Sequence, residues 1–514
     1  MDNANVRSFF RVLAKLLSFK RVLSCCREPL NNVLKHRAHQ VFVKIVVMAD
    51  DQLHIFFFPM MAHGHIIPTL DMAKLFVSRG AKATIITTPL NLPIFIQSIE
   101  KIKHLGLEIY VKAIRFPAVE AGLPEGCERM DQLNSYDLVP KFFKATTMLQ
   151  EQLELLLHEC QPNALVADMF FPWATESAAK FHIPRLVFHG MGFFALCASE
   201  NLRHYKPQKN VCSDTEPFVL PNLPHKVKLT RMKLAPYDRE ETEMTKFIEQ
   251  VKESESTSFG VIVNSFYELE PDYADYYRKV LGKRAWHIGP ILLCNRKNEE
   301  KFHKSVDHKQ HECLQWLDTK KQNSVIYVCF GSMSNFTDSQ IEEIALGLEA
   351  SEQEFIWVVR KGKIPEGFEE RTKEKGLIIR GWAPQVLILD HKAIGAFVTH
   401  CGWNSTLESV SAGVPLVTWP MFAEQFFNEQ LITKVLKIGV AVGAEEWSIV
   451  VDNVKSEAIT KAVKRVMVGE ESKEMRRRAK EVKKMANKAV EEGGSSYSDL
   501  NALFQELRTI NLHM

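Results

Sequence analysis

Short apolar runs alternate with helical segments in two separate series along this chain, and this alternation restricts the possible folds more than any other feature. The first series contains an apolar run at 53–59, a helical segment at 67–80 and a second run at 82–89. In the helical segment, Pro68 lies near the expected start and Gly80 just past the expected end. Continuous apolar runs of this length are typical of parallel strands buried on both faces. This part of the chain therefore predicts a doubly wound sheet covered by helices.

A second series begins near Ser324 and repeats the same pattern. Thr337, with Gln340 three residues later, predicts the start of a helix at Asp338. Further strands are expected at 164–168, 184–189, 324–330, 354–360, 376–382, 395–400 and 415–420. The sequence thus predicts an α/β protein with two Rossmann-like domains, whose parallel sheets face each other across a cleft.

The expected domain boundaries follow from changes in composition. A chain of 514 residues is too long for one ordinary core, and residues 295–312 are charged and poor in apolar side chains. We expect a first domain at 48–293, a charged linker at 294–312, a second domain at 313–490 and a C-terminal helix and tail at 491–514. A helical stripe is expected near the end of the second domain, with Arg476, Arg477 and Arg478 on its wet face, and its apolar members are Met475, Ala479, Val482, Ala486 and Ala489.

Residues 1–47 form a basic extension that we expect to be poorly ordered. They carry nine Lys or Arg against Asp2 and Glu28, whereas the whole chain has a net charge of only +3. The extension is open to three interpretations: a transit peptide, a membrane-surface helix, or an upstream segment without a role in the fold, with Met48 as the working start. The remainder is slightly acidic, which argues against a nucleic-acid partner.

The location of the protein is indicated by its cysteines and its hydropathy. Ten cysteines without a Cys-x-x-Cys pair fit a reducing compartment, so we expect a cytoplasmic protein, with organelle targeting through residues 1–47 as the alternative. No apolar run approaches the ~18–20 residues that a membrane span requires.

Residues 382–425 combine the side chains that a nucleotide-activated sugar would need. The stretch 398–413 passes from a strand through a Gly turn, at Gly402, into a helix that is expected to start at Asn404 or Ser405. Free amides at such a helix start bind phosphate. The chain has neither a Walker loop nor a G-x-G-x-x-G fingerprint there.

Four further side chains complete this set. Glu408, one turn after Asn404, can accept hydrogen bonds from ribose hydroxyls. An exposed indole at Trp382 can stack on a base, and Glu424 and Gln425 suit the vicinal hydroxyls of a sugar.

The whole stretch, with its spacing intact, resembles the signature box of plant secondary-product glycosyltransferases, which are UDP-sugar-dependent enzymes of the GT-B fold. The resemblance extends from about Met48 to Leu507. It implies that Trp382 stacks on uracil beside the Ala383 backbone and Gln385, and that Glu408 holds the ribose. It further implies a diphosphate site at His400, Asn404 and Ser405, a sugar site at Trp403, Glu424 and Gln425, and a second phosphate loop at Ser332 and Ser334.

Several of these residues also have a purely structural interpretation. Trp403 and Trp382 could be core aromatics, and His400 a structural histidine, while Trp419 is expected in the core.

Gln425 at the last position of the box resembles glucose-using members of the family. A UDP-sugar would be a co-substrate, so no cofactor is expected, and the protein is expected to be a monomer.

Two histidines, His63 and His65, follow the first strand and are candidates for a general base. Imidazole suits proton removal near neutral pH. In the family the catalytic histidine precedes x-x-Pro, as His65 precedes Pro68, and Asp168 matches the acidic partner that orients it. Asp168 could instead only cap a turn. We expect the helix dipole to disfavour the charged form of His65.

A metal site at His63 and His65 is not expected, because no third ligand is evident and the chain has no Asp-x-Asp. The resemblance implies a single displacement that inverts an α-linked donor to a β-glycoside.

The acceptor is expected in the first domain, where phenylalanines lie near the proposed base. Phe170, Phe188 and Phe193 are the candidates for its wall, although each could equally be a core residue. Such a wall suits a flavonoid, terpenoid, steroid or hormone with a hydroxyl group. Gly190 stands where some family members have a hydroxyl side chain that reaches the sugar.

Two other classes of protein remain open from the sequence. A nucleotide-dependent oxidoreductase would share the two Rossmann-like domains, but the missing glycine fingerprint argues against it. The other is a non-catalytic protein that binds UDP-sugars or lipophilic molecules. Such a protein would not need the His65 and Asp168 pair, so the presence of this pair argues against it.

Overall fold

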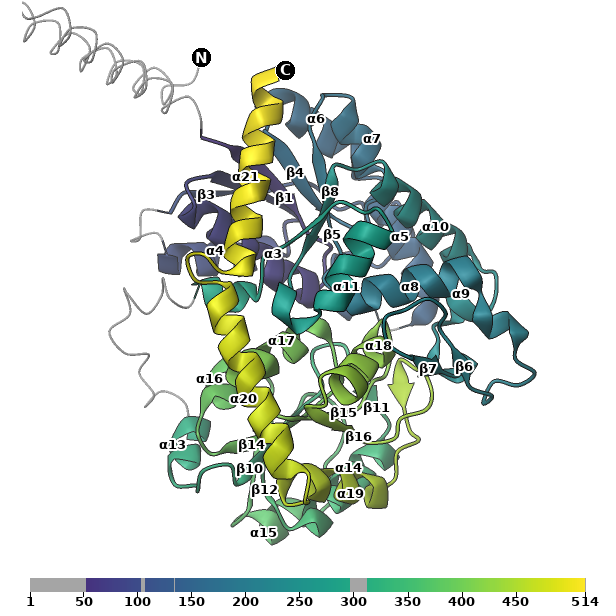
Figure 1. The fold of residues 1–514 in the computed structure, drawn as a ribbon, viewed down its shortest axis with the longest axis vertical. Coiled ribbons are helices and arrows are strands. Elements are labelled where there is room, and N and C mark those ends of the chain that lie inside the picture. Colours follow the sequence, from purple (N-terminus) through teal and green to yellow (C-terminus); the bar gives the residue numbers. More distant parts are fainter. Residues whose placement is uncertain (1–51, 103–106, 134, 296–311, 514) are drawn as a thin grey trace, which may run out of the picture. The chain divides into compact units, whose positions relative to one another are not determined.

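The computed structural model describes residues 52–102, 107–133, 135–295 and 312–513 of the chain. It separates into a unit at Met1–Gln52 and a second unit at Leu53–Met514. The basic extension at 1–47 and most of the charged linker lie outside the described residues. The second unit contains two parallel sheets with their helices (Figure 1).

The first sheet has seven strands in the order β3-β2-β1-β4-β5-β8-β9, and every pair is parallel. The strand order reverses beside β1, which pairs with both β2 and β4. Ligands of doubly wound sheets bind at the carboxyl ends of the strands around such a reversal. The strands are β1 His54–Phe58, β2 Lys82–Thr87, β3 Ile109–Ala113, β4 Ala164–Asp168, β5 Arg185–Phe188, β8 Gly260–Val263 and β9 Ala285–His287.

The second sheet has six parallel strands in the order β13-β12-β10-β14-β15-β16. Its order reverses beside β10, which pairs with β12 and β14. We call the first sheet and its helices the N-terminal lobe, and the second sheet and its helices the C-terminal lobe. The strands are β10 Val325–Cys329, β12 Glu354–Val359, β13 Gly376–Arg380, β14 Ile394–Thr399, β15 Leu416–Thr418 and β16 Gly439–Ala441.

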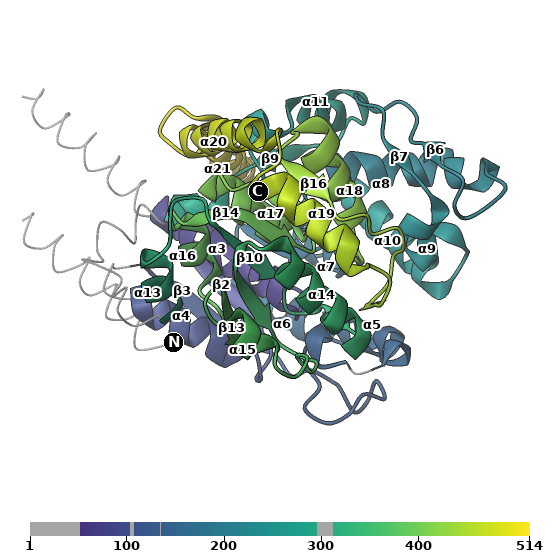
Figure 2. The same cartoon turned by 90° about the horizontal axis from the view of Figure 1, so that it is seen from below.

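Helices follow most strands and cover both faces of each sheet (Figures 1 and 2). In the N-terminal lobe they are α3 His63–Ser78, α4 Leu92–Ile102, α5 Val139–Thr147, α6 Gln150–Cys160, α7 Ala174–Ala179, α8 Phe193–Tyr205, α9 Pro236–Arg239, α10 Glu243–Ser256 and α11 Pro271–Asp275. The later helices are α13 Glu312–Asp318, α14 Asp338–Ser351, α15 Phe368–Thr372, α16 Gln385–Asp390, α17 Trp403–Ala412, α18 Gln425–Gln430, α19 Ser456–Met467, α20 Ser472–Ala489 and α21 Ser495–His513. Short strand pairs join β6 Phe218–Val219 to β7 Lys228–Leu229, and β11 Asn335–Phe336 to β17 Val450–Val451.

Helix starts were predicted with unequal success. The Thr337 cap of α14 is confirmed, because its hydroxyl accepts a hydrogen bond from the Gln340 amide at 3.2 Å. In contrast, α3 begins at His63, five residues before Pro68, so that both histidines belong to its first turn. Pro68 lies inside the helix and has no amide hydrogen to donate to the Gly64 carbonyl four residues earlier, and this carbonyl accepts from Asn404 Nδ2 at 2.8 Å instead.

The apolar stripe of α20 is confirmed, but one of its three arginines differs from the prediction. Met475, Ala479, Ala486 and Ala489 are buried. Arg477 and Arg478 are solvent-facing and pair with Glu474. Arg476 instead folds back toward α19 and donates to the Met467 carbonyl at 2.6 Å, which satisfies a free carbonyl at the end of that helix.

The last helix, α21, returns to the N-terminal lobe and packs beside β9 (Figure 1). Its buried side chains belong to the same hydrophobic cluster as β1 and α3, and the rings of Phe504 and Phe76 lie 5.1 Å apart. Helix α20, which precedes it, contacts both α17 and the helical turn Tyr267–Leu269 of the N-terminal lobe. The C-terminal helices therefore connect the two lobes. No helix among the described residues has the length and apolar content to span a bilayer.

Leu503→Ala tests this docking, because Leu503 is fully buried between α21 and the first sheet. We expect the free energy of unfolding to fall by about 2–5 kcal/mol, the usual cost of removing a buried leucine side chain. Urea denaturation would measure it. Gln505→Ala on the exposed face of the same helix is the matched control, and equal losses for the two variants would contradict the docking.

Candidate active site

His65 and the buried Asp168 form a hydrogen-bonded pair at the strand-order reversal of the first sheet. Asp168 is the last residue of β4, and His65 lies in the first turn of α3, directly after the neighbouring strand β1. His65 Nδ1 is 2.6 Å from Asp168 Oδ2, and Asp168 Oδ1 accepts the Phe170 amide at 3.1 Å. Because a carboxylate only accepts, Nδ1 carries the proton and Nε2 has a free lone pair. The His65 side chain is 22% exposed, which leaves it accessible to a substrate.

The pKa of His65 is raised above its ordinary value. Burial disfavours the imidazolium and lowers the pKa, but the charge of Asp168, its hydrogen bond and the charge of Glu424 outweigh burial. This net direction is opposite to the one expected from the helix dipole. The neighbouring carboxylates are closer and carry full charges, so they dominate.

His63 points to a different carboxylate. Its Nδ1 lies 3.4 Å from Asp131 Oδ2, within the segment Met130–Gln132. The structure thus separates the two candidate bases, and only His65 is joined to Asp168.

Gly190 leaves space beside the His65 ring. It adopts a left-handed conformation with φ +74°, and a Cβ built there would lie 3.7 Å from His65 Cε1. A side chain at this position would be strained and would touch the imidazole.

His400 lies between two loops of the C-terminal lobe. A Cβ at Gly331, after β10, would come within 2.7 Å of the His400 ring, and one at Gly402 within 2.5 Å. Glycine is therefore required on both sides of this imidazole. Burial lowers the pKa of His400 to about 4, so the ring is neutral at pH 7.

Ser332 and Ser334 lie on the loop after β10, which borders this histidine, and Ser405 lies in the first turn of α17. The Ser334 hydroxyl donates to the Phe330 carbonyl, and Ser332 is half-buried on the same loop. A cavity beside them is lined by Gly331, Ser334 and Arg360, among others, at the carboxyl ends of β10 and β12.

Gln385 connects the side chains that were predicted for the nucleoside. Its Nε2 donates to Glu408 at 2.5 Å and to Ser405 Oγ at 3.1 Å, while its Oε1 accepts from Tyr327 at 3.2 Å. Burial raises the pKa of Glu408 to about 7. Trp382 is exposed, as expected, with 72% of its surface accessible, and Ala383 beside it is buried.

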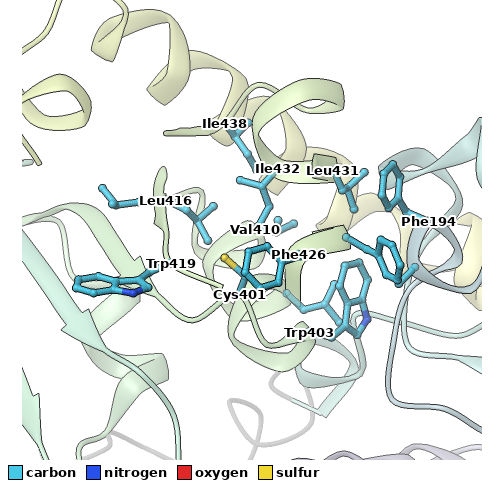
Figure 3. Close-up of a cluster of buried hydrophobic side chains, with 14 of the residues drawn as sticks. Phe194, Cys401, Trp403, Val410, Leu416, Trp419, Phe426, Leu431, Ile432 and Ile438 are labelled. Atoms are coloured by element: carbon cyan, nitrogen blue, oxygen red, sulfur yellow. The ribbon is translucent and has the colours of Figure 1, made fainter. Parts of the chain in front are cut away.

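Trp403 extends from the start of α17 into the N-terminal lobe. Its indole N–H donates to the Asn264 carbonyl at 2.7 Å, and the ring covers Gly192, where a Cβ would be only 2.5 Å away. The side chain is 2% exposed, and Figure 3 shows it in one cluster with Phe194 of α8 and Phe426 of α18. The ring thus belongs to the contact between the lobes.

Asn404, the next residue, contacts the segment that carries the candidate base. Its Nδ2 donates to the carbonyl of Gly64 at 2.8 Å, one residue before His65. Trp403 and Asn404 together therefore bring the amino end of α17 against the turn that holds His65.

Glu424 and Gln425 lie at the start of α18, and their environments differ. Glu424 is half-buried, accepts from Asn428 Nδ2 at 3.1 Å, and is close enough to His65 for each to influence the charge of the other. Gln425 is buried, and its Oε1 accepts the amides of Met421 and Phe422 at 2.9 and 3.1 Å. Both lone pairs of Gln425 Oε1 are thus used by backbone amides, which leaves only its side-chain N–H groups for a ligand.

The predicted acceptor residues separate into two groups. Phe170 lies 5.8 Å from the His65 ring, but Phe188 and Phe193 are fully buried in the hydrophobic core. They therefore do not line an accessible wall, because their strand and helix direct both rings inward.

Two phenylalanines that the sequence analysis missed accompany Phe170. Phe143 of α5 and Phe247 of α10 lie 5.4 and 6.4 Å from the Phe170 ring, and 4.8 Å from each other. These segments lie far apart in the chain and carry no motif, so only the fold brings them together. Among the described residues, no three His, Cys, Asp or Glu side chains gather as a metal-binding group.

Comparison with known proteins agrees with this arrangement. The family model described as UDP-glucoronosyl and UDP-glucosyl transferase matches residues 127–484. Scopoletin glucosyltransferase of Nicotiana tabacum is 62% identical over 470 residues, covering 89% of this chain and 98% of the tobacco protein. Anthocyanin 3'-O-beta-glucosyltransferase of Gentiana triflora is 56% identical over 475 residues, covering 89% and 98%. A crystal structure from Glycyrrhiza uralensis, with glycyrrhetinic acid 3-O-monoglucuronide bound, has a TM-score of 0.83 and 43% identity, covering 90% and 97%.

Two parallel sheets, each with its strand-order reversal next to the candidate site, define the GT-B class of glycosyltransferases, as predicted. The relatives extend over nearly the full length of both chains. This chain belongs to the UDP-glucoronosyl and UDP-glucosyl transferase family, among the plant UDP-glycosyltransferases.

Trp403→Phe tests the contact between the lobes. The variant keeps an aromatic ring but leaves the buried Asn264 carbonyl without its donor, which costs about 1–3 kcal/mol. Trp419→Phe is the matched control, since Trp419 is equally buried and its indole nitrogen has no hydrogen-bond partner in the described part of the chain. Urea denaturation should show the larger loss for Trp403→Phe, and equal losses would contradict the assigned hydrogen bond.

Proposed function

We propose that this protein transfers glucose from UDP-glucose to a hydroxyl group of a flat lipophilic molecule such as scopoletin or a flavonoid. The observation that carries the proposal is the His65–Asp168 pair, held next to Asn404 and Glu424 of the opposite lobe. The names of the relatives, which include a scopoletin and an anthocyanin glucosyltransferase, support the choice of sugar and acceptor class.

The donor would lie along the carboxyl edge of the second sheet. Trp382 would stack on uracil and Glu408, oriented by Gln385, would accept from the ribose hydroxyls. The diphosphate would meet the first amides of α17, His400, Ser405 and the loop of Ser332 and Ser334. The positive end of a helix stabilises an anion there without a metal ion.

The sugar would lie between α18 and His65. Glu424 is the side chain best placed to accept from its hydroxyls, because it is the carboxylate of the C-terminal lobe that acts on His65. Gln425 would contribute its amide N–H groups, since its oxygen already accepts two backbone amides. Trp403 would act through its backbone, as its indole is committed to Asn264.

The transfer would proceed in one displacement. His65 Nε2 takes the proton of the acceptor hydroxyl as the oxygen attacks the anomeric carbon, and the bond from that carbon to the diphosphate oxygen breaks. Asp168 stabilises the imidazolium that forms. Attack from the face opposite UDP converts an α-linked donor into a β-glucoside, while the α17 amides meet the charge on the leaving group.

The acceptor would rest on the half-buried rings of Phe170 and Phe247, with the buried Phe143 ring packed against both. Ring centroids 4.8–6.4 Å apart suit a flat ring system, and Phe170 brings that system to His65.

Removal of the base is the direct test. Purified protein with UDP-glucose and a panel of scopoletin, flavonoids, terpenoids and steroids should give products with the added mass of one hexose. His65→Ala should lower kcat by roughly 10²- to 10⁴-fold, the usual contribution of a general base. His63→Ala, the matched control, should retain most of the activity, and a His65→Ala variant of normal activity would refute the mechanism.

The pH dependence follows from the raised pKa of His65. The imidazolium cannot accept a proton, so kcat/KM should fall as the pH drops through a value above the ordinary histidine pKa of about 6.5. Asp168→Asn removes the charge that raises this pKa and replaces a charge-assisted hydrogen bond with a weaker neutral one, while burial still lowers the pKa. The acid limb should therefore move to lower pH, with kcat reduced roughly 10²- to 10⁴-fold.

Rate profiles measured between about pH 5 and 9 would show this shift. Asp131→Asn is the control, because Asp131 contacts His63. An acid limb in Asp168→Asn at the wild-type position would contradict the assigned pair.

A further inference from the structure

Arg185 is a buried cation directly below the Asp168 strand end. It begins β5, and its Cα is in register with Leu165, three residues before Asp168. Its side chain runs along the sheet, and Nη2 donates to the main-chain carbonyl of Asp168 at 2.8 Å. Nη1 donates to Thr175 Oγ1 at 2.6 Å and to Ser254 Oγ at 3.3 Å. One guanidinium therefore ties the end of β4 to α7 and α10.

Glu255 is a buried anion that holds the neighbouring loop. It follows Ser254 in α10, and its Oε2 lies 2.8 Å from Nε2 of His189, the residue after β5. The Tyr277 hydroxyl donates to its other oxygen at 2.7 Å. His189 directly precedes Gly190, which lies against the His65 ring. Glu255 therefore fixes the loop that borders the candidate base.

Further charged side chains form ion pairs around Glu255. Lys252 of α10 lies 3.4 Å from Glu255 and 2.8 Å from Glu200 of α8, and Lys283 lies 3.5 Å from Glu255. Arg203 pairs with Glu200 at 2.9 Å. Burial disfavours the charged forms of Glu200, Lys252 and Glu255. It also lowers the pKa of Arg185 to about 10, although the charges of Asp168 and Glu255 oppose this.

Stability alone does not account for such a cluster. Replacing buried ion pairs by apolar side chains of similar volume is often neutral or stabilising. Apolar contacts, however, cannot orient a main-chain carbonyl, whereas a guanidinium fork can. Arg185 contacts α10 at Ser254, and Glu255 is the next residue of the same helix. The end of α10 therefore positions the loops after both β4 and β5.

We propose that Arg185 and Glu255 are positioning residues of the transfer reaction. They act through the two loops that flank His65: Arg185 holds the Asp168 backbone, and Glu255 holds the His189–Gly190 turn. This inference rests on the proposed role of His65 as the base. Neither residue touches a substrate, so both should affect kcat and leave donor binding unchanged.

Arg185→Lys is the first test variant, because it keeps the charge but cannot form the two directed contacts together. Glu255→Gln, which keeps the shape of the side chain, is the second. Asp499→Asn is the matched control: Asp499 pairs with His287 and Arg278 at β9, three strands away from β4. UDP titration by calorimetry counts the folded, donor-binding sites, and kcat is expressed per such site.

We expect kcat to fall about 10- to 100-fold in Arg185→Lys and Glu255→Gln, the scale of a ~1 Å misplacement, with the KM for UDP-glucose within about twofold of wild type. Asp499→Asn should keep its kcat. On a His65→Ala background, Arg185→Lys should change the residual rate by less than about threefold, because its effect passes through the His65–Asp168 pair.

Three outcomes would overturn the positioning role. The first is a wild-type kcat per UDP-binding site in both variants. The second is full additivity of Arg185→Lys with His65→Ala. The third is loss of UDP binding in both variants, which would show that the cluster serves only the stability of the fold. An active His65→Ala enzyme would instead refute the proposed base, and the two failures are thus distinguishable.

Discussion

The hydrogen bond from the Trp403 indole to the Asn264 carbonyl, with that from Asn404 to Gly64 beside it, is the contact on which the site geometry depends. Both come from the first turn of α17, the same turn whose amides face the proposed diphosphate. Two consecutive residues of the signature stretch therefore set the distance between the proposed UDP-sugar site and His65. A side chain at position 192 would collide with the indole, so glycine is needed there for the ring to pack against the N-terminal lobe.

Below this contact, each lobe presents loops from its own strand-order reversal. Asp168 and Gly190 flank His65 in one lobe, while Gly331 and Gly402 enclose His400 in the other. Opposite electrostatic effects act on the two histidines: neighbouring carboxylates raise the pKa of His65, whereas burial lowers the pKa of His400. One imidazole is thus suited to gain a proton, and the other is neutral at pH 7.

Most of the fold could be predicted from the sequence, because buried parallel strands and capped helices leave local patterns such as the run 324–330 and the Thr337 cap. The strand-end places of His65, Asp168 and the exposed Trp382 could also be predicted, whereas the pairing of His65 with Asp168 was implied by the family resemblance. The commitment of the Trp403 indole to Asn264, and the gathering of Phe143 and Phe247 around Phe170, could not be predicted, since they depend on long-range packing. Phe188 and Phe193 carried no signal that distinguishes a wall from a core.

The return of α21 to the N-terminal lobe has a consequence for biosynthesis. Leu500, Leu503, Phe504 and Leu507 complete the hydrophobic cluster under β1, yet the ribosome makes them after both sheets. While the second sheet is being translated, the earlier one exposes the apolar groove that this helix will cover. Nascent chains at that stage present a surface that chaperones bind, and the first lobe reaches its final packing only after the second has been synthesised.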